Sequence, residues 1–363
     1  MRRAIPFLLL PALISGCGNS SSTSTSGGVN LTVTAALDPS LKYFRSYGDS
    51  ITYGFNLPDR TSAFPYLVAN YNNLTANWKD FSNPGDQACD VPTHQIFQHF
   101  EDPSISLKGL FSLMIGSNDA DVKTPGPYEV TYNLCHQASI AWLADPQESK
   151  VRGSSPLVTT SGPTHYDTNN FWNAQVTDAP NASVTFPLQL SVQSPVYVWY
   201  RIIDGNPGAF SYTIDGVVRG VLTTATLTPI ATQHHVTDSL ALLRIPGIAP
   251  GAHVFTFTQT TDGLSGAAIV AVGAPPTRDL SARPRVLVGT IPYELDHAND
   301  SNNLPYIADQ KANVALLAGD GLDVELYDSR TYMTGSTADM IDPRHPNALG
   351  HQEIFKALED TLK

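Results

Sequence analysis

Two short motifs far apart in the chain hold the three residue types that nucleophilic acyl chemistry requires. Ser50 lies in a Gly-Asp-Ser turn early in the sequence, and Asp342 and His345 form an Asp-x-x-His motif late in it. A serine hydroxyl is a weak nucleophile until a base takes its proton, and that base needs a third group to fix its tautomer. We therefore predict Ser50 as the nucleophile, His345 as the general base and then the general acid, and Asp342 as the residue that orients His345.

Two further motifs lie between them. Gly85 belongs to an Asn-Pro-Gly-Asp turn after a strand-like run, and Asn118 follows the apolar run 110–115. A glycine backbone N–H and an asparagine side-chain amide both suit the stabilisation of a developing oxyanion. We expect Gly85 and Asn118 to serve as these donors.

With Ser50, Gly85, Asn118 and His345 in this order, the chain resembles the SGNH hydrolases, also called the GDSL esterase/lipase family, which are named after these four residue types. The resemblance implies a flavodoxin-like, three-layer α/β/α hydrolase domain with a parallel sheet. It also implies a hydrolase acting on ester bonds, with an acyl-enzyme on Ser50, a third oxyanion donor at the Ser50 N–H, and no metal or organic cofactor. Esters, thioesters and O-acetylated sugars are the substrates it implies.

The order of the predicted elements agrees with an α/β domain split into residues 41–152 and 277–363. Strands that alternate with helices imply a parallel sheet, with the site at the carboxyl ends of the strands. The motifs with Ser50, Gly85 and Asn118 each follow such a strand. The patterns predict strands at 43–47, 78–82, 110–115, 285–292 and 324–327, and helices at 62–70, 91–100, 134–144, 306–317 and 347–362.

Between these halves, residues 153–276 carry little helical periodicity. Short alternating runs at 183–186, 196–200, 210–214, 254–257 and 268–272, separated by turn residues, predict an inserted all-β domain of sandwich or jelly-roll type. We hypothesise that this insert walls the active site or binds a glycan. Its aromatic residues at strand period favour a sandwich core over a sugar-stacking platform: Trp199, Tyr200, Tyr212 and Phe255.

The first 40 residues read as an export signal and a tether. Arg2 and Arg3 precede a short apolar run, and the segment that ends at Cys17 resembles a bacterial lipobox. In that interpretation 1–16 is a lipoprotein signal peptide, Cys17 carries the lipid, and the Ser/Thr/Gly-rich residues 17–40 form a flexible tether. Gly18 points to the outer membrane, facing the periplasm or the surface. The alternative is an ordinary cleaved signal peptide.

The composition limits the classes of partner that the protein can bind. The net charge is −12 at pH 7, so no basic stripe is available to neutralise nucleic-acid phosphates. Beyond Cys17 only Cys89 and Cys135 remain. In an oxidising compartment they could pair, which would stabilise the fold by about 4 kcal/mol; two buried free thiols are the equal alternative. The expected partner is a small ester or an acylated glycan or lipid, together with the membrane that holds the anchor, and the oligomeric state stays open.

Each site residue also has a purely structural interpretation. Ser50 could be a helix N-cap, Gly85 a plain turn residue, Asn118 an Asx-turn and His345 a surface residue at a helix start. Asp49 is expected to organise the turn before Ser50, and Asp119 to orient neighbouring loops. We interpret His351 as a surface or capping residue.

Other motifs are weaker. Residues 263–267 approach a nucleophile elbow but lack its final glycine, and His234, His235 and Asp296 with His297 lack a second ligand cluster at zinc spacing. The sequence leaves two alternative functions open. One is a surface lipoprotein for adhesion or glycan binding with a non-catalytic hydrolase scaffold, and the other is an O-acyltransferase that uses the same triad.

Overall fold

The computed structural model describes residues 40–97, 108–122, 126–167, 173–204, 208–224, 230, 237–261, 266–276 and 283–363. The expected signal peptide, Cys17 and all of the tether except Ser40 lie outside these residues, as do His234, His235 and most of 263–267. Within the described ranges, no helix combines the length and the apolar character needed to cross a membrane.

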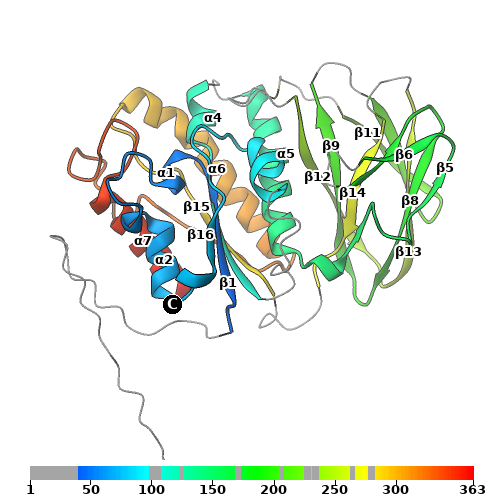
Figure 1. The fold of residues 1–363 in the computed structure, drawn as a ribbon. Coiled ribbons are helices and arrows are strands. Elements are labelled where there is room, and N and C mark those ends of the chain that lie inside the picture. Colours follow the sequence, from blue (N-terminus) through cyan, green and yellow to red (C-terminus); the bar gives the residue numbers. More distant parts are fainter. Residues whose placement is uncertain are drawn as a thin grey trace, which may run out of the picture. The chain divides into compact units, whose positions relative to one another are not determined.

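A five-stranded parallel sheet holds the first and last parts of the chain together (Figure 1). Its two inner strands from the first part are buried along their whole length, as expected for strands covered on both faces. In spatial order the strands are β16 (Val324–Tyr327), β15 (Arg285–Gly289), β3 (Gly109–Met114), β1 (Tyr43–Gly48) and β2 (Trp78–Asp80).

Helices cover both faces of this sheet. Successive strand residues point to opposite faces, and in β1 Tyr43 and Tyr47 enter one hydrophobic cluster while Phe44 enters the other. The Phe44 side is covered by α2 (Phe64–Tyr71) and α7 (Ala348–Leu362), and the Tyr43 side by α5 (Pro127–Ala144) and α6 (His297–Gly319) (Figure 1). Shorter helices are α1 (Ser50–Tyr53), a π-helix (Val91–Ile96), α4 (Ser117–Val122) and single 3₁₀ turns (Arg60–Ser62, Thr75–Asn77, Gln147–Ser149).

Two antiparallel sheets form the middle of the chain. Phe210 of the first sheet and Tyr200 of the second lie 5.6 Å apart between ring centroids, so the two sheets share a core. The first contains β11 (Val217–Thr223), β10 (Ala209–Ile214), β13 (Gly251–Gln259), β8 (Ser183–Leu190) and β5 (Thr159–Ser161). The second contains β12 (Asp238–Ile248), β9 (Ser194–Ile203), β14 (Ala268–Gly273), β7 (Ala174–Thr177) and β6 (Thr164–Asp167), with β4 (Lys150–Arg152) paired to β14.

The second antiparallel sheet packs on α5. The Trp199 indole N–H donates to the Ala138 carbonyl at 3.2 Å, and the rings of Trp199 and Trp142 meet edge-to-face at 5.4 Å. Nearby, Arg244 forms a two-point ion pair with Asp320 at the C-terminal end of α6. Trp199, Tyr200 and Phe255 are buried, so these aromatics belong to the core and are not available to stack on a sugar.

Several predicted boundaries differ from the structure. The segment predicted as a helix from 91 is a π-helix up to Ile96, and α5 begins at Pro127 instead of 134. We predicted the next helix from 306, yet α6 begins at His297 and continues through Pro305. Contacts outside the helix hold its first turns, because Asn303 donates to Glu294 and Asp300 accepts from the Glu294 N–H. Tertiary contacts thus override the helix-breaking tendency of proline.

Candidate active site

Three of the sequence-predicted residues follow the carboxyl ends of adjacent parallel strands. Ser50 comes after β1, Gly85 lies in the loop after β2, and Asn118 lies in α4 after β3. Asp342 and His345 belong to the segment between β16 and α7. Carboxyl ends of parallel strands share one edge of the sheet, which is where ligand sites of such sheets are built.

Ser50, His345 and Asp342 form one continuous hydrogen-bonded line. His345 Nδ1 lies 2.8 Å from Asp342 Oδ2, and His345 Nε2 lies 2.9 Å from Ser50 Oγ. The ionised Asp342 carboxylate can only accept, so Nδ1 carries the hydrogen and Nε2 is left to accept from the serine hydroxyl. Both distances lie within the range required for proton transfer. The arrangement can therefore remove the Ser50 proton.

The Asp342 carboxylate is held ionised. Burial on its own would raise its pKa, but hydrogen bonds from the backbone N–H groups of Arg344 and His345 and from the His345 ring lower the pKa of Asp342 to about 2. A carboxylate that stays charged at all ordinary pH values can stabilise an imidazolium formed at His345.

Asp49, not Ser50, caps the helix that follows β1. Its side chain accepts from the Ile51 N–H at 2.9 Å, and Ser50 is the first residue of α1. The interpretation of Ser50 as a simple N-cap is therefore wrong, while Asp49 organises the turn as expected. The turn also requires Gly48, which adopts φ 154°: a Cβ there would lie 2.2 Å from the Met114 carbonyl oxygen.

The predicted oxyanion donors are fixed by the loops that carry them. Asn118 Nδ2 donates to the Asp86 carbonyl at 2.9 Å, which orients the amide and leaves its second N–H. Gly85 adopts the left-handed φ of 91°. Among the described residues, the N–H groups of Ser50 and Gly85 donate to no protein atom. Three N–H donors are therefore left for a ligand in the loops that follow β1, β2 and β3.

Gln95 ties the β1 and β2 loops together. Its side-chain oxygen accepts from the Gly48 N–H at 2.8 Å, and its amide donates to the Gly48 carbonyl and to Asp86 Oδ2, both at 2.7 Å. The Asn83 N–H donates to the same Gly48 carbonyl. Sequence reasoning missed Gln95, because a glutamine in a helix-like segment gives no signal that it will bridge two loops.

A disulfide fastens the same loop region to α5. Cys89 and Cys135 form a disulfide bond, with 5.0 Å between their Cα atoms. Of the two alternatives, pairing is therefore confirmed and two free thiols are wrong. Ser239 of β12 donates to the Cys89 carbonyl at 2.8 Å. The loop that carries Gly85 is thereby linked both to α5 and to the antiparallel sheets.

Two carboxyl groups beneath the site are fully buried. Burial raises the pKa of Asp49 and of Asp119 to about 7, although hydrogen bonds to each carboxylate oppose the rise. Asp119 accepts from the Ala88 N–H and the Tyr128 hydroxyl, both at 3.0 Å, and so connects the Gly85 loop with α5 as expected. Near neutral pH these groups are divided between their protonated and ionised forms.

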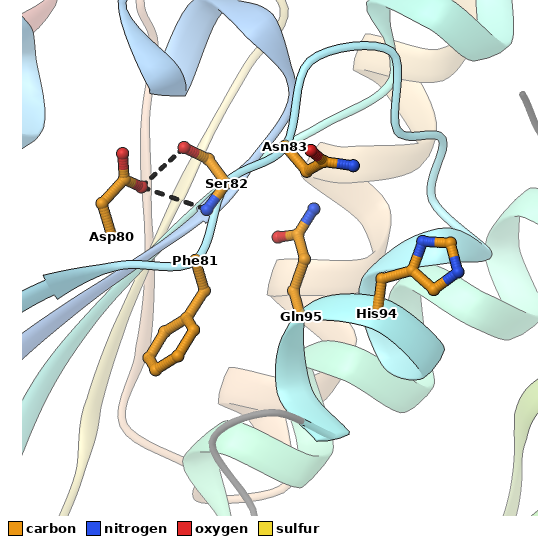
Figure 2. Close-up of a pocket in the computed structure, with 6 residues that line it drawn as sticks. All are labelled: Asp80, Phe81, Ser82, Asn83, His94 and Gln95. Carbon is orange, nitrogen blue, oxygen red and sulfur yellow. Dashed lines mark hydrogen bonds between the residues drawn. The ribbon is translucent and has the colours of Figure 1, made fainter. Parts of the chain in front are cut away.

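A hollow of about 240 Å³ lies beside the β2 loop (Figure 2). No triad residue lines it; its walls are Asp80, Phe81, Ser82, Asn83, His94 and Gln95. Next to it Asp86, Asp90 and His94 place ligand atoms within 4.8 Å of one another, a grouping that could hold a metal ion. Both Asp86 oxygens already accept hydrogen bonds, from Asn83 and Gln95.

His351 was expected to be a surface or capping residue, and its placement at the surface is wrong. It is buried in α7, and its Nδ1 accepts from the N–H of Phe64, the first residue of α2. Burial lowers the pKa of His351 to about 3, so the ring is neutral. It therefore joins α7 to the start of α2 and takes no part in the line from Ser50 to Asp342.

Comparisons with known proteins give only distant likenesses. No family model and no curated protein matches the chain. A two-domain esterase active on acetylated mannans, crystallised with mannopentaose, is 11% identical with a TM-score of 0.35, over 65% of this chain and 92% of that one. A CBM36 domain of a xylanase from the hindgut metagenome of Trinervitermes trinervoides is 16% identical with a TM-score of 0.28, over 36% of this chain and 98% of that one.

A CBM35 domain from Cellvibrio japonicus is similarly distant, at 15% identity and a TM-score of 0.28 over 36% of this chain and 94% of that one. At these values the likenesses carry no assignment of function. The family resemblance stays an interpretation of the motifs, and the geometry of the site is the stronger support for a function.

Proposed function

We propose that the protein is a serine esterase of the SGNH type, built on a flavodoxin-like three-layer domain and acting on carboxylic esters. The observation that carries the proposal is the unbroken line from Ser50 Oγ through the His345 ring to Asp342, at 2.9 and 2.8 Å. A histidine with an ionised carboxylate on one nitrogen and a serine hydroxyl on the other is the arrangement that general-base catalysis at serine requires.

The chemistry proceeds in two halves. Ser50 Oγ attacks the ester carbonyl carbon while His345 Nε2 takes the hydroxyl proton, and the N–H groups of Ser50, Gly85 and Asn118 bind the oxyanion. Collapse breaks the bond to the alcohol, which leaves with the proton from His345. Water then attacks the acyl-enzyme with His345 as base, and the acid and free Ser50 are released.

The substrate class is a small ester or an acylated glycan or lipid, and the antiparallel sheets support this only indirectly. Their fixed contact with α5 gives a wall that adjoins the Gly85 loop, through Ser239 and Cys89. No exposed aromatic platform for a sugar is formed by Trp199, Tyr200 or Phe255, which weighs against a protein whose main task is glycan adhesion through these residues.

We also propose export and lipid anchoring through Cys17, in the outer membrane, on the strength of the lipobox-like segment. Cells that express the chain should incorporate labelled palmitate into it, and Cys17→Ala should abolish the incorporation. Equal labelling of both proteins would contradict the anchor.

The esterase proposal is tested with purified protein and p-nitrophenyl esters of increasing acyl length. Ser50→Ala should abolish hydrolysis and labelling by a fluorophosphonate probe, while Ser183→Ala in β8 should leave both unchanged. Equal hydrolysis by the Ser50→Ala variant and the wild type would overturn the proposal.

A further inference from the structure

The turn that follows the nucleophile reaches back to the other two members of the line. The Asn56 side-chain amide donates to Asp342 Oδ2 at 2.9 Å, across a separation of 286 residues. The Phe55 ring lies against the His345 ring, with 5.0 Å between centroids and 48° between planes. One dipeptide therefore contacts both the acid and the base.

The backbone conformation of this turn brings Phe55 and Asn56 to these contacts. Gly54 ends α1 in the left-handed region at φ 74°, the Phe55 N–H donates to the Ser50 carbonyl at 2.9 Å, and Asn56 is again left-handed at φ 65°. Asparagine is among the few residues other than glycine that adopt this conformation readily. The two left-handed residues turn the chain back over α1, so that the positions of Phe55 and Asn56 are set by Ser50 itself.

The carboxylate of Asp342 has a defined distribution of donors. Oδ1 accepts from the N–H groups of Arg344 and His345, which belong to its own loop. His345 Nδ1 lies 2.9 Å from Oδ1 and 2.8 Å from Oδ2, and Asn56 is the donor to Oδ2 that comes from another part of the fold. Without Asn56, the described structure leaves the plane of the carboxylate to contacts within the Asp342–His345 loop alone.

We propose that Asn56 and Phe55 are positioning residues for the base: Asn56 fixes the Asp342 carboxylate, and Phe55 fixes the plane of the His345 ring. This inference rests on the proposed esterase function, since it assigns roles for the same reaction. Neither residue exchanges a proton with substrate, and both act through the two residues that they contact.

The other charged or titratable groups near His345 each have a defined partner or protonation state. Arg344 is paired with Asp121 and approaches Glu294, and His351 is buried and neutral. Asp49 is buried beside Ser50 and titrates in the neutral range. A pH–rate profile alone would also report the titration of Asp49, so the His345 ring has to be followed directly.

The test uses Asn56→Gly, which removes the amide without straining the left-handed backbone, and Asn56→Asp, which places a like charge beside Asp342. Asn73→Gly is the matched control, because Asn73 is exposed and also left-handed, at φ 56°. We expect Asn56→Gly to lower kcat roughly threefold to tenfold, as for loss of one hydrogen bond, with KM within about twofold. Asn56→Asp should be lower still, and Asn73→Gly should equal the wild type.

The second readout does not need turnover. Removing the Asn56 hydrogen bond leaves more negative charge on Oδ2, which favours the protonated imidazole. The NMR titration of the His345 ring should therefore move to higher pH in Asn56→Gly, and Phe55→Ala should lower kcat while broadening the same signals. Unchanged kcat and an unchanged titration in Asn56→Gly would overturn the inference. If the wild-type protein shows no ester hydrolysis that depends on Ser50, only the proposed function is overturned. The NMR titration still reports whether Asn56 acts on the Asp342–His345 pair.

Discussion

The edge of the parallel sheet and the surface of the antiparallel sheets both contain hydrogen-bonded aspartate–histidine pairs. His345 lies 2.8 Å from Asp342, and in the antiparallel sheets His253 lies 2.7 Å from Asp215 and His165 lies 2.7 Å from Asp178. The distances to the carboxylates are nearly the same. What differs is the second ring nitrogen.

In His253 that nitrogen faces the Ala249 carbonyl oxygen at 2.8 Å, which can only accept. Acceptors on both sides require both ring nitrogens to carry hydrogen, and the hydrogen bond to Asp215 raises the pKa of His253 accordingly. A histidine held in this form cannot take a proton. His345 differs because its second nitrogen meets the Ser50 hydroxyl, which can donate. An aspartate–histidine pair therefore becomes able to act as a base only through its third partner.

The largest predicted effect comes from removing the histidine of the Asp342–His345 pair, in comparison with removing that of the Asp215–His253 pair. His345→Ala should lower kcat/KM by about 10⁴-fold or more, as for removal of a triad member, whereas His253→Ala should leave it within about twofold. Ester hydrolysis by the two purified variants, after both have been shown to be folded, gives the measurement. A similar loss in both would mean that the pairs are not functionally different.

The next effect concerns the connection between the two regions. Replacing Cys89 and Cys135 by alanine removes a disulfide between residues 46 positions apart in the sequence. This should lower the free energy of unfolding by about 4 kcal/mol. Ser239→Ala, which removes only the hydrogen bond to the Cys89 carbonyl, should cost about 1 kcal/mol. Denaturant titration of both variants tests the order, and equal midpoints for the double variant and the wild type would refute it.

A smaller loss should follow from removing one oxyanion donor. Asn118→Ala should lower kcat about 10²- to 10³-fold, because its amide donates where charge develops. Asn70→Ala, an exposed asparagine in α2, should have no effect. Steady-state kinetics distinguish the two, and an Asn118→Ala variant with normal kcat would limit this residue to holding the Asp86 carbonyl.

The smallest effect is on stability against pH. Burial raises the pKa of Asp49 and Asp119 to about 7 in the folded protein, whereas in the unfolded chain they titrate near 3.8. Between those values these two carboxyl groups bind more protons in the folded protein, so their contribution to the free energy of unfolding falls as pH rises from about 4 to about 7. The buried His136 and His351, whose pKa values are lowered to about 3, contribute in the opposite direction, so the prediction concerns the difference between a variant and the wild type. In Asp49→Asn, the Tm of the variant minus that of the wild type should increase by roughly 2 °C or more across this window, whereas the exposed Asp59→Asn should leave the difference nearly constant. A constant difference in Asp49→Asn would contradict the prediction.

The sequence could single out Ser50, Asp342 and His345, which the structure brings into one hydrogen-bonded line, because their signals are local. Gly-Asp-Ser and Asp-x-x-His each place their side chains through a single turn, and the strands before them are apolar runs that can be recognised without a partner. Asn56 could not be found in this way, since its contact with Asp342 depends on two turns and on a sequence separation of 286 residues. His351 was misplaced for the same reason: only the packing of α7 on α2 buries it.

The order of strands in the parallel sheet has a consequence for how the chain is made. β3 sits between β1 and β15, but β15 begins at Arg285, after all the antiparallel strands. During synthesis from the N-terminus, one edge of β3 has no neighbour until that whole stretch has emerged, and an unpaired apolar strand edge invites association with other chains. Asp342 and His345 emerge later still. The nascent polypeptide therefore carries Ser50 for most of its synthesis without His345 and Asp342, and the proposed triad is complete only when the final segment docks.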